Sequence, residues 1–119
     1  MRPKTSDYEA VRQLGWTIVA CVKTGNGQKL KELFFNQGVV FGCSDGNFAN
    51  GSLTAFIGAI DGHPAGDSLS ASVDVISMDD TVAVLRIVEN GPFSFTHLAT
   101  VLRVKDTWKI CSYVYNQDA

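Results

Sequence analysis

The sequence predicts an α+β fold in which helices pack on a mainly antiparallel sheet. Apolar residues recur at helical spacing in the first part of the chain, and they alternate with other residues along most of the second half. The chain has 119 residues and a net charge of −2. This length predicts one domain, residues 1–119, with one hydrophobic core.

Three helices are expected. The first covers about residues 6–23, because its apolar stripe follows an N-cap and an acidic first turn. A glycine-rich turn ends it, and a second helix is expected over about residues 27–35 with its lysines facing outward. The third begins after Asn50 or Ser52, continues to Ile60 and stops at Asp61-Gly62.

The strands are predicted from alternation and turn residues. Residues 39–43 are expected to form a short strand after the second helix, with a brief extended piece around Phe48. From Leu69 the chain alternates, turns near residues 78–80 and returns over residues 81–89. The expected order is therefore helix, helix, strand, helix and four strands.

Two long alternating runs, residues 93–104 and 108–115, predict a final antiparallel hairpin. With Lys105-Asp106 as the two loop residues, Val101 lies opposite Ile110 and Ala99 lies opposite Ser112. One face then collects Phe95, His97, Ala99, Val101, Arg103, Trp108, Ile110, Ser112 and Val114. The other face mixes Thr, Leu and Tyr side chains, which favours a homodimer formed through the sheet.

The ending Leu102-Arg-Val-Lys-Asp-Thr-Trp-Lys-Ile-Cys-Ser-Tyr-Val-Tyr115 resembles the terminal hairpin of the nuclear transport factor 2-like superfamily, in particular its putative lumazine-binding branch. That branch usually carries Leu-x-Lys-x-x-Gly-x-Trp-Lys-Ile; here Asp106 replaces the turn Gly, and Tyr113 stands where Lys is common. The resemblance covers nearly the whole chain. It implies a cone-shaped fold, with three N-terminal helices packed on a curved sheet and the third helix at the rim of a pocket.

His97 is the candidate catalytic residue, because alternation places it on the face that should meet the helices. There an imidazole could act as an acid, a base or a ligand donor; the alternative is a structural histidine bonded to a carbonyl or to Ser112. Asp74 is the acid that alternation places within a strand, and it is expected to face water, so no acidic partner for His97 is predicted. The predicted pocket residues are Trp16, Phe41, Phe56, Phe95, His97 and Ser112.

The composition and the motifs of the sequence argue against several classes of partner. A pI near 5.5 without a Lys/Arg cluster argues against nucleic acid, and the longest apolar run is too short to cross a membrane. The N-terminus lacks the pattern of a signal peptide, which predicts a cytoplasmic protein. The three cysteines are widely spaced and no metal-ligand or dinucleotide motif is present, so no metal and no cofactor are expected.

Three functions remain open from the sequence. The first is binding of a small apolar or aromatic metabolite in a pocket between the helices and the concave sheet. The second is an isomerase-, dehydratase- or cyclase-like enzyme that uses His97 as acid or base. The third is a dimeric scaffold with a vestigial pocket.

Overall fold

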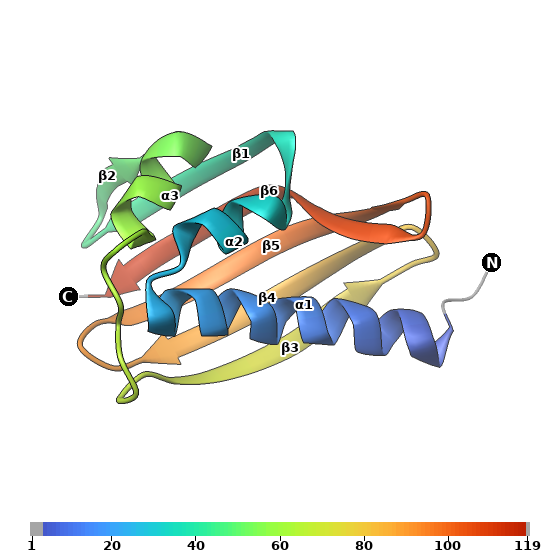
Figure 1. Cartoon of the computed structure of the whole chain (residues 1–119), viewed down its shortest axis with the longest axis horizontal. Coiled ribbons are helices and arrows are strands. Elements are labelled where there is room, and N and C mark those ends of the chain that lie inside the picture. Colours follow the sequence, from blue (N-terminus) through green and yellow to red (C-terminus); the bar gives the residue numbers. More distant parts are fainter. Residues whose placement is uncertain (1–3, 119) are drawn as a thin grey trace.

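The structure is a computed structural model that describes residues 4–118, the side chain of Asn50 excepted. Three helices and six strands follow one another within this range (Figure 1). In chain order they are α1 (Thr5–Thr24), α2 (Gly27–Glu32), β1 (Phe34–Ser44), β2 (Asn47–Asn50), α3 (Leu53–Ile60), β3 (Ser70–Met78), β4 (Val82–Asn90), β5 (Ser94–Val104) and β6 (Thr107–Asp118).

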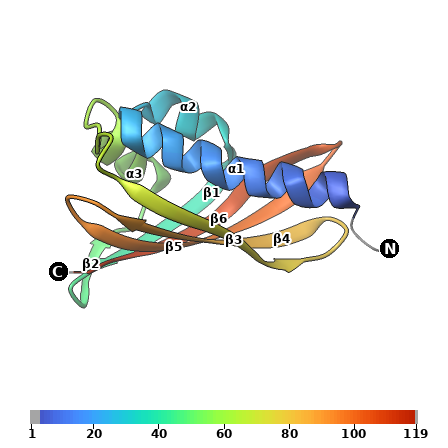
Figure 2. The same cartoon turned by 90° about the horizontal axis from the view of Figure 1, so that it is seen from below.

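The six strands form one open sheet in the order β2-β1-β6-β5-β4-β3. Only the β1–β6 pair is parallel, so the predicted α+β class with a mainly antiparallel sheet is confirmed. All three helices lie on one face of the sheet, which is visibly twisted (Figure 2). The third helix comes after β2, so it is inserted between strands and does not precede the sheet.

The helix α2 ends earlier than the sequence predicts. It stops at Glu32, and Phe34 already pairs with Ile110 at the start of β1. The backbone N–H of Ile110 donates to the carbonyl of Leu33 at 2.8 Å. Pairing with β6 therefore replaces the last turn of the expected helix, while Phe34 keeps the buried position that either structure would give it.

The core lies between α1 and the covered face of the sheet. Its helical side comes from the predicted stripe, in which Val11 and Ile18 are fully buried. A methyl group on Gly15 would collide with Val73, so this glycine lets α1 lie close to β3. The strand residues that complete the core are Val40, Val73, Ala83, Leu85, Ile87, Ala99, Val101, Ile110 and Tyr113.

The β5–β6 hairpin follows the predicted register only near its turn. Val101 lies opposite Ile110, as expected, and Arg103 lies opposite Trp108 with its guanidinium 5.9 Å from the ring centre. The register then shifts, because β6 holds one extra residue at Cys111, whose thiol donates to the carbonyl of Thr100 at 3.3 Å. The predicted pairing of Ala99 with Ser112 is therefore wrong: Ala99 lies opposite Tyr113.

Both residues of the β5–β6 turn adopt a left-handed backbone conformation, which affects stability. Lys105 and Asp106 have φ values of 52° and 64°, which are unfavourable for residues with a Cβ atom. We expect Asp106→Gly to raise the free energy of unfolding by about 0.5–1 kcal/mol, because glycine adopts this conformation without the steric penalty. Urea unfolding of both proteins measures the change, and a less stable variant would contradict the prediction.

Within residues 4–118, none of the helices is long and apolar enough to span a bilayer.

Candidate functional site

A buried carboxylate–imidazole pair lies on the covered face of the sheet. Glu89 comes from the end of β4 and His97 from β5, and they are 1% and 3% exposed. Glu89 Oε1 and His97 Nε2 are 2.5 Å apart. An ionised carboxylate can only accept, so Nε2–H donates the proton of this bond. The pair supplies the acidic partner that the sequence did not predict for His97.

Three buried polar atoms of this cluster have no hydrogen-bond partner among the described residues. They are Glu89 Oε2, His97 Nδ1 and the Tyr113 hydroxyl. Tyr113 is fully buried on β6, and its ring centre is 5.3 Å from that of His97. Buried polar atoms are nearly always bonded, because leaving one unpaired costs about 1–3 kcal/mol. Three of them in one cluster indicate a polar site that water or a ligand completes.

Aromatic rings surround the pair and keep it away from water. Phe95 stacks on His97 with ring centres 5.5 Å apart and an interplanar angle of 17°. Phe56 reaches the cluster from α3, with its ring centre 5.0 Å from that of Tyr113. The ring centre of Tyr115 lies 6.0 Å from that of His97. This apolar shell lowers the local dielectric, so charges and hydrogen bonds inside it act more strongly than in water.

The environment keeps Tyr113 in its neutral form. Burial raises the pKa of its hydroxyl well above the ordinary value, and the negative charge of Glu89 and then the neighbouring Tyr115 raise it further. A phenol with a raised pKa keeps its proton at neutral pH. Tyr113 is therefore a hydrogen-bond donor held beside a carboxylate.

This raised pKa predicts how stability changes in base. Above the ordinary tyrosine pKa of 10.0, the unfolded chain loses the Tyr113 proton while the folded protein keeps it. The free energy of unfolding should therefore fall as the pH rises above 10, with a contribution from Tyr113 of up to about 1.4 kcal/mol per pH unit. We expect Tyr113→Phe to remove this contribution in urea unfolding at pH 9 and pH 11. An equal loss of stability in both proteins would contradict the prediction.

The larger of two described cavities has a volume of about 740 Å³. It lies where α1 ends and where the β4–β5 turn and the loop after α3 come together, at the left of Figure 1. Glu89 and Phe95 form the part of its wall that belongs to the buried cluster. Its other lining residues are Val22, Ala59, Ile60, Gly62, His63, Pro64, Ala65, Leu69, Pro92, Phe93 and Gln117.

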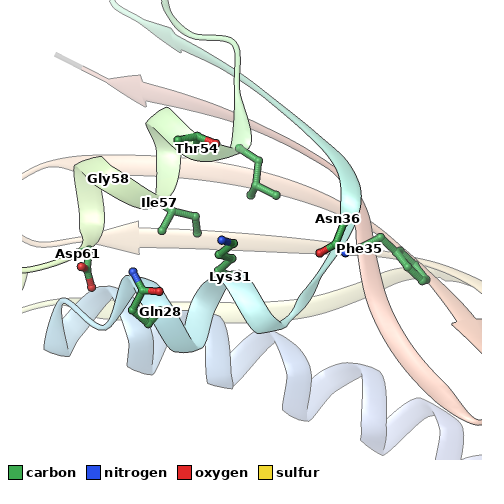
Figure 3. A pocket seen from close by; sticks show the side chains of 9 residues that line it. Gln28, Lys31, Phe35, Asn36, Thr54, Ile57, Gly58 and Asp61 are labelled. Carbon is green, nitrogen blue, oxygen red and sulfur yellow. The ribbon is translucent and has the colours of Figure 1, made fainter.

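The smaller cavity, of about 560 Å³, lies between α2, α3 and the start of β1. Figure 3 shows Lys31 projecting from α2 toward α3, with Gln28 and Asp61 on one side and Asn36 on the other. Its polar residues are mostly exposed, and none of the buried unpartnered atoms belongs to its lining. Of the two cavities, only the larger is therefore lined by a residue with a buried unpartnered polar atom, Glu89.

The structure brings together half of the predicted pocket residues. Phe56, Phe95 and His97 meet in the buried cluster. Phe95 is the one predicted pocket residue that lines either of the two cavities, whereas Trp16, Phe41 and Ser112 belong neither to the cavities nor to the cluster. Trp16 is 36% exposed on α1, Phe41 is 51% exposed on the uncovered face of β1, and the extra residue at Cys111 turns Ser112 away from His97.

The sequence reasoning missed Glu89 and Tyr113. The signal for Glu89 was present, because Ala83, Leu85, Ile87 and Glu89 alternate along β4 and all four are buried. The expectation that Asp74 was the acid within a strand was therefore incomplete, although Asp74 is indeed exposed. Tyr113 was missed because its face depends on the shifted register of β6. Among residues 4–118, no group of three or more metal-ligating side chains comes together.

Comparison with known proteins agrees with this architecture. Aldolase FrzH of a Cladobotryum species is 29% identical over 115 residues, which cover 94% of this chain and 92% of that relative. A solved nuclear transport factor 2-like protein of unknown function from Methylobacillus flagellatus superposes with a TM-score of 0.89, at 20% identity, over 98% of this chain and 95% of that one. A counterpart from Shewanella baltica gives 0.86, at 22% identity, over 98% of both chains.

The family assignment covers almost the entire chain. Residues 6–116 match the family described as "Putative lumazine-binding". The chain therefore belongs to this family, and it shares the fold of solved nuclear transport factor 2-like proteins.

Proposed function

We propose that this protein is an enzyme that binds a partly apolar carbonyl compound in the larger cavity and removes a proton from the carbon next to the carbonyl. One observation carries the proposal: Glu89 lines this cavity, and its Oε2 has no partner while Oε1 is held by His97. A carboxylate fixed by one oxygen in an apolar wall suits general base catalysis. Small-molecule binding, one of the three functions that the sequence left open, is then the first step of the reaction.

The chemistry divides among three side chains. Glu89 Oε2 takes the proton, and the C–H electron pair becomes an enolate. Tyr113 does not itself line the cavity, so the enolate oxygen must reach past Glu89 into the buried cluster to accept a hydrogen bond from the neutral Tyr113 hydroxyl. His97 acts through Glu89 as a positioning residue, because its Nε2–H is committed to Glu89 Oε1. The sequence-based role of His97 as the acid or base itself is therefore assigned to Glu89.

The enolate has a further step available that matches the relative named aldolase. Its carbon can form a C–C bond with a second carbonyl group, whose oxygen then takes the proton from Glu89. Return of the proton to a different carbon would give isomerisation instead. Both routes share the first proton transfer, so that transfer is the step to test.

Exchange of α-protons tests the proposal without knowledge of the natural substrate. We would incubate the protein in D₂O with a panel of cyclic ketones, acetylnaphthalenes and arylacetaldehydes, all of which carry α-protons, and follow the α-proton signals by NMR. At least one compound should lose its α-protons faster with catalytic amounts of protein than with buffer. A ligand that binds in the cavity without any exchange across the panel would instead show a binding protein.

We also propose a homodimer formed through the uncovered face of the sheet. Phe41, Val114 and Leu98 lie side by side across β1, β6 and β5, and each is between 42% and 51% exposed. A row of apolar side chains on a helix-free face supports association. Sedimentation should show a dimer that Leu98→Asp shifts toward monomer, and a wild-type monomer at all concentrations would contradict the proposal.

We also propose that the protein is cytoplasmic. Cys21, Cys43 and Cys111 are all unpaired thiols, as expected where disulfides do not persist.

A further inference from the structure

The larger cavity is lined by one acidic side chain and by no lysine or arginine among the described residues. The acidic side chain, Glu89, is buried at its inner end. Most of the remaining wall is aliphatic or aromatic, including Phe93 and Phe95. A negatively charged ligand would lose its hydration there and would find a like charge in place of a partner.

The outer end of the cavity offers a matched donor and acceptor. His63 Nδ1–H donates to the carbonyl of Asp61 at 2.9 Å, which leaves Nε2 of the neutral ring as an acceptor. The carbonyl oxygen of the Gln117 side chain accepts from the Ser44 hydroxyl at 3.4 Å, so its NH₂ group is free to donate. A hydroxyl or an amide on a ligand can both donate and accept, so it suits a donor and an acceptor that line the same cavity.

We infer that the substrate is an uncharged carbonyl compound whose carbonyl reaches Glu89, whose middle is apolar, and whose far end carries a hydroxyl or amide bound by His63 and Gln117. This inference rests on the proposed function for the orientation of the carbonyl. It assigns specificity to two residues outside the catalytic cluster, and it makes carboxylated and phosphorylated compounds poor ligands. A volume of about 740 Å³ suits a molecule with two fused rings and short substituents.

Three probes of one shape separate these features. They are 6-hydroxy-2-acetylnaphthalene, the same compound without the hydroxyl, and 6-hydroxy-2-naphthoic acid, in which a carboxylate replaces the acetyl group. Fluorescence titration at pH 7 measures their affinities. The hydroxyketone should bind about 30-fold more tightly than the ketone without the hydroxyl, which is the effect of roughly two hydrogen bonds, one to His63 and one to Gln117.

The acid should bind about 100-fold more weakly than the hydroxyketone, as expected for two negative charges about 6 Å apart at an effective dielectric of about 20. In Glu89→Gln this difference should shrink to less than about 10-fold, because the repelling charge is gone. His63→Leu with Gln117→Leu should erase the advantage of the hydroxyl. Lys31→Gln, a charge change in the smaller cavity, should leave all three affinities unchanged.

The two proposals fail in different ways. The acetyl methyl of the hydroxyketone carries α-protons, so exchange and affinity are read on the same compound. The predicted affinities without exchange would overturn the enzymatic function and leave the ligand class standing. Equal affinity for ketone and acid in the wild-type protein, or no binding of any probe, would overturn the inferred substrate class.

Discussion

Glu89→Gln should slow the exchange of substrate α-protons by about 1,000-fold, within the range that a positioned general base contributes. The amide has nearly the shape of the carboxylate, and its oxygen can still accept the His97 Nε2 proton that Glu89 accepts at 2.5 Å. The variant therefore keeps the geometry of the cluster and loses the basic oxygen. NMR in D₂O measures the rate on whichever ketone the panel identifies.

Asp74→Asn is the matched control for this experiment. It makes the same chemical change on β3, at an exposed position on the far side of the sheet from the cavity, where its neighbour across the strands is Arg86. Its exchange rate should equal that of the wild-type protein. If Glu89→Gln also exchanged at the wild-type rate, Glu89 would not be the base and the proposed reaction would be wrong.

Tyr113→Phe should separate stability from activity. The hydroxyl is buried without a partner, so its removal should leave the free energy of unfolding at neutral pH unchanged or raise it by about 1 kcal/mol. The same change removes the donor to the enolate oxygen and should lower the exchange rate by about 100-fold. Urea unfolding and the exchange assay measure the two effects on one sample.

Tyr8→Phe provides the control, because Tyr8 is 41% exposed on α1. It should change neither quantity. A loss of more than about 1 kcal/mol in Tyr113→Phe would show that the hydroxyl is bonded in the folded protein. An unchanged exchange rate would remove Tyr113 from the mechanism.

Most helices and strands followed from residue patterns, apart from the last turn expected for α2, but the faces of two strands did not. Alternation gives the correct register at Val101 and Ile110, close to the turn. One extra residue at Cys111 then exchanges the two faces of β6, so Tyr113 points inward where Ser112 was expected. A bulge depends on the pairing of two strands, and nothing in the local sequence of β6 marks it.

The other misplaced aromatic residues have separate causes. Phe41 sits between Val40 and Gly42, which are both buried, and a run that is apolar on both faces does not indicate which face is covered. Trp16 could have been excluded from the sequence, because it is two residues from both Leu14 and Ile18 and therefore lies on the other side of the helix. Large aromatic size suggested a pocket role that the helical geometry does not allow.

The proposed abstraction of a proton by Glu89 depends on where the proton between Glu89 and His97 lies. Nitrogen-15 NMR of the imidazole ring distinguishes a protonated ring nitrogen from one that carries a free lone pair. We expect a proton on Nε2 that is coupled to that nitrogen and shared with Glu89 Oε1, and the signal of this proton should disappear in His97→Gln. An unprotonated Nε2 that accepts from a neutral Glu89 would contradict it, because Glu89 would then have no negative charge with which to take a proton from a substrate.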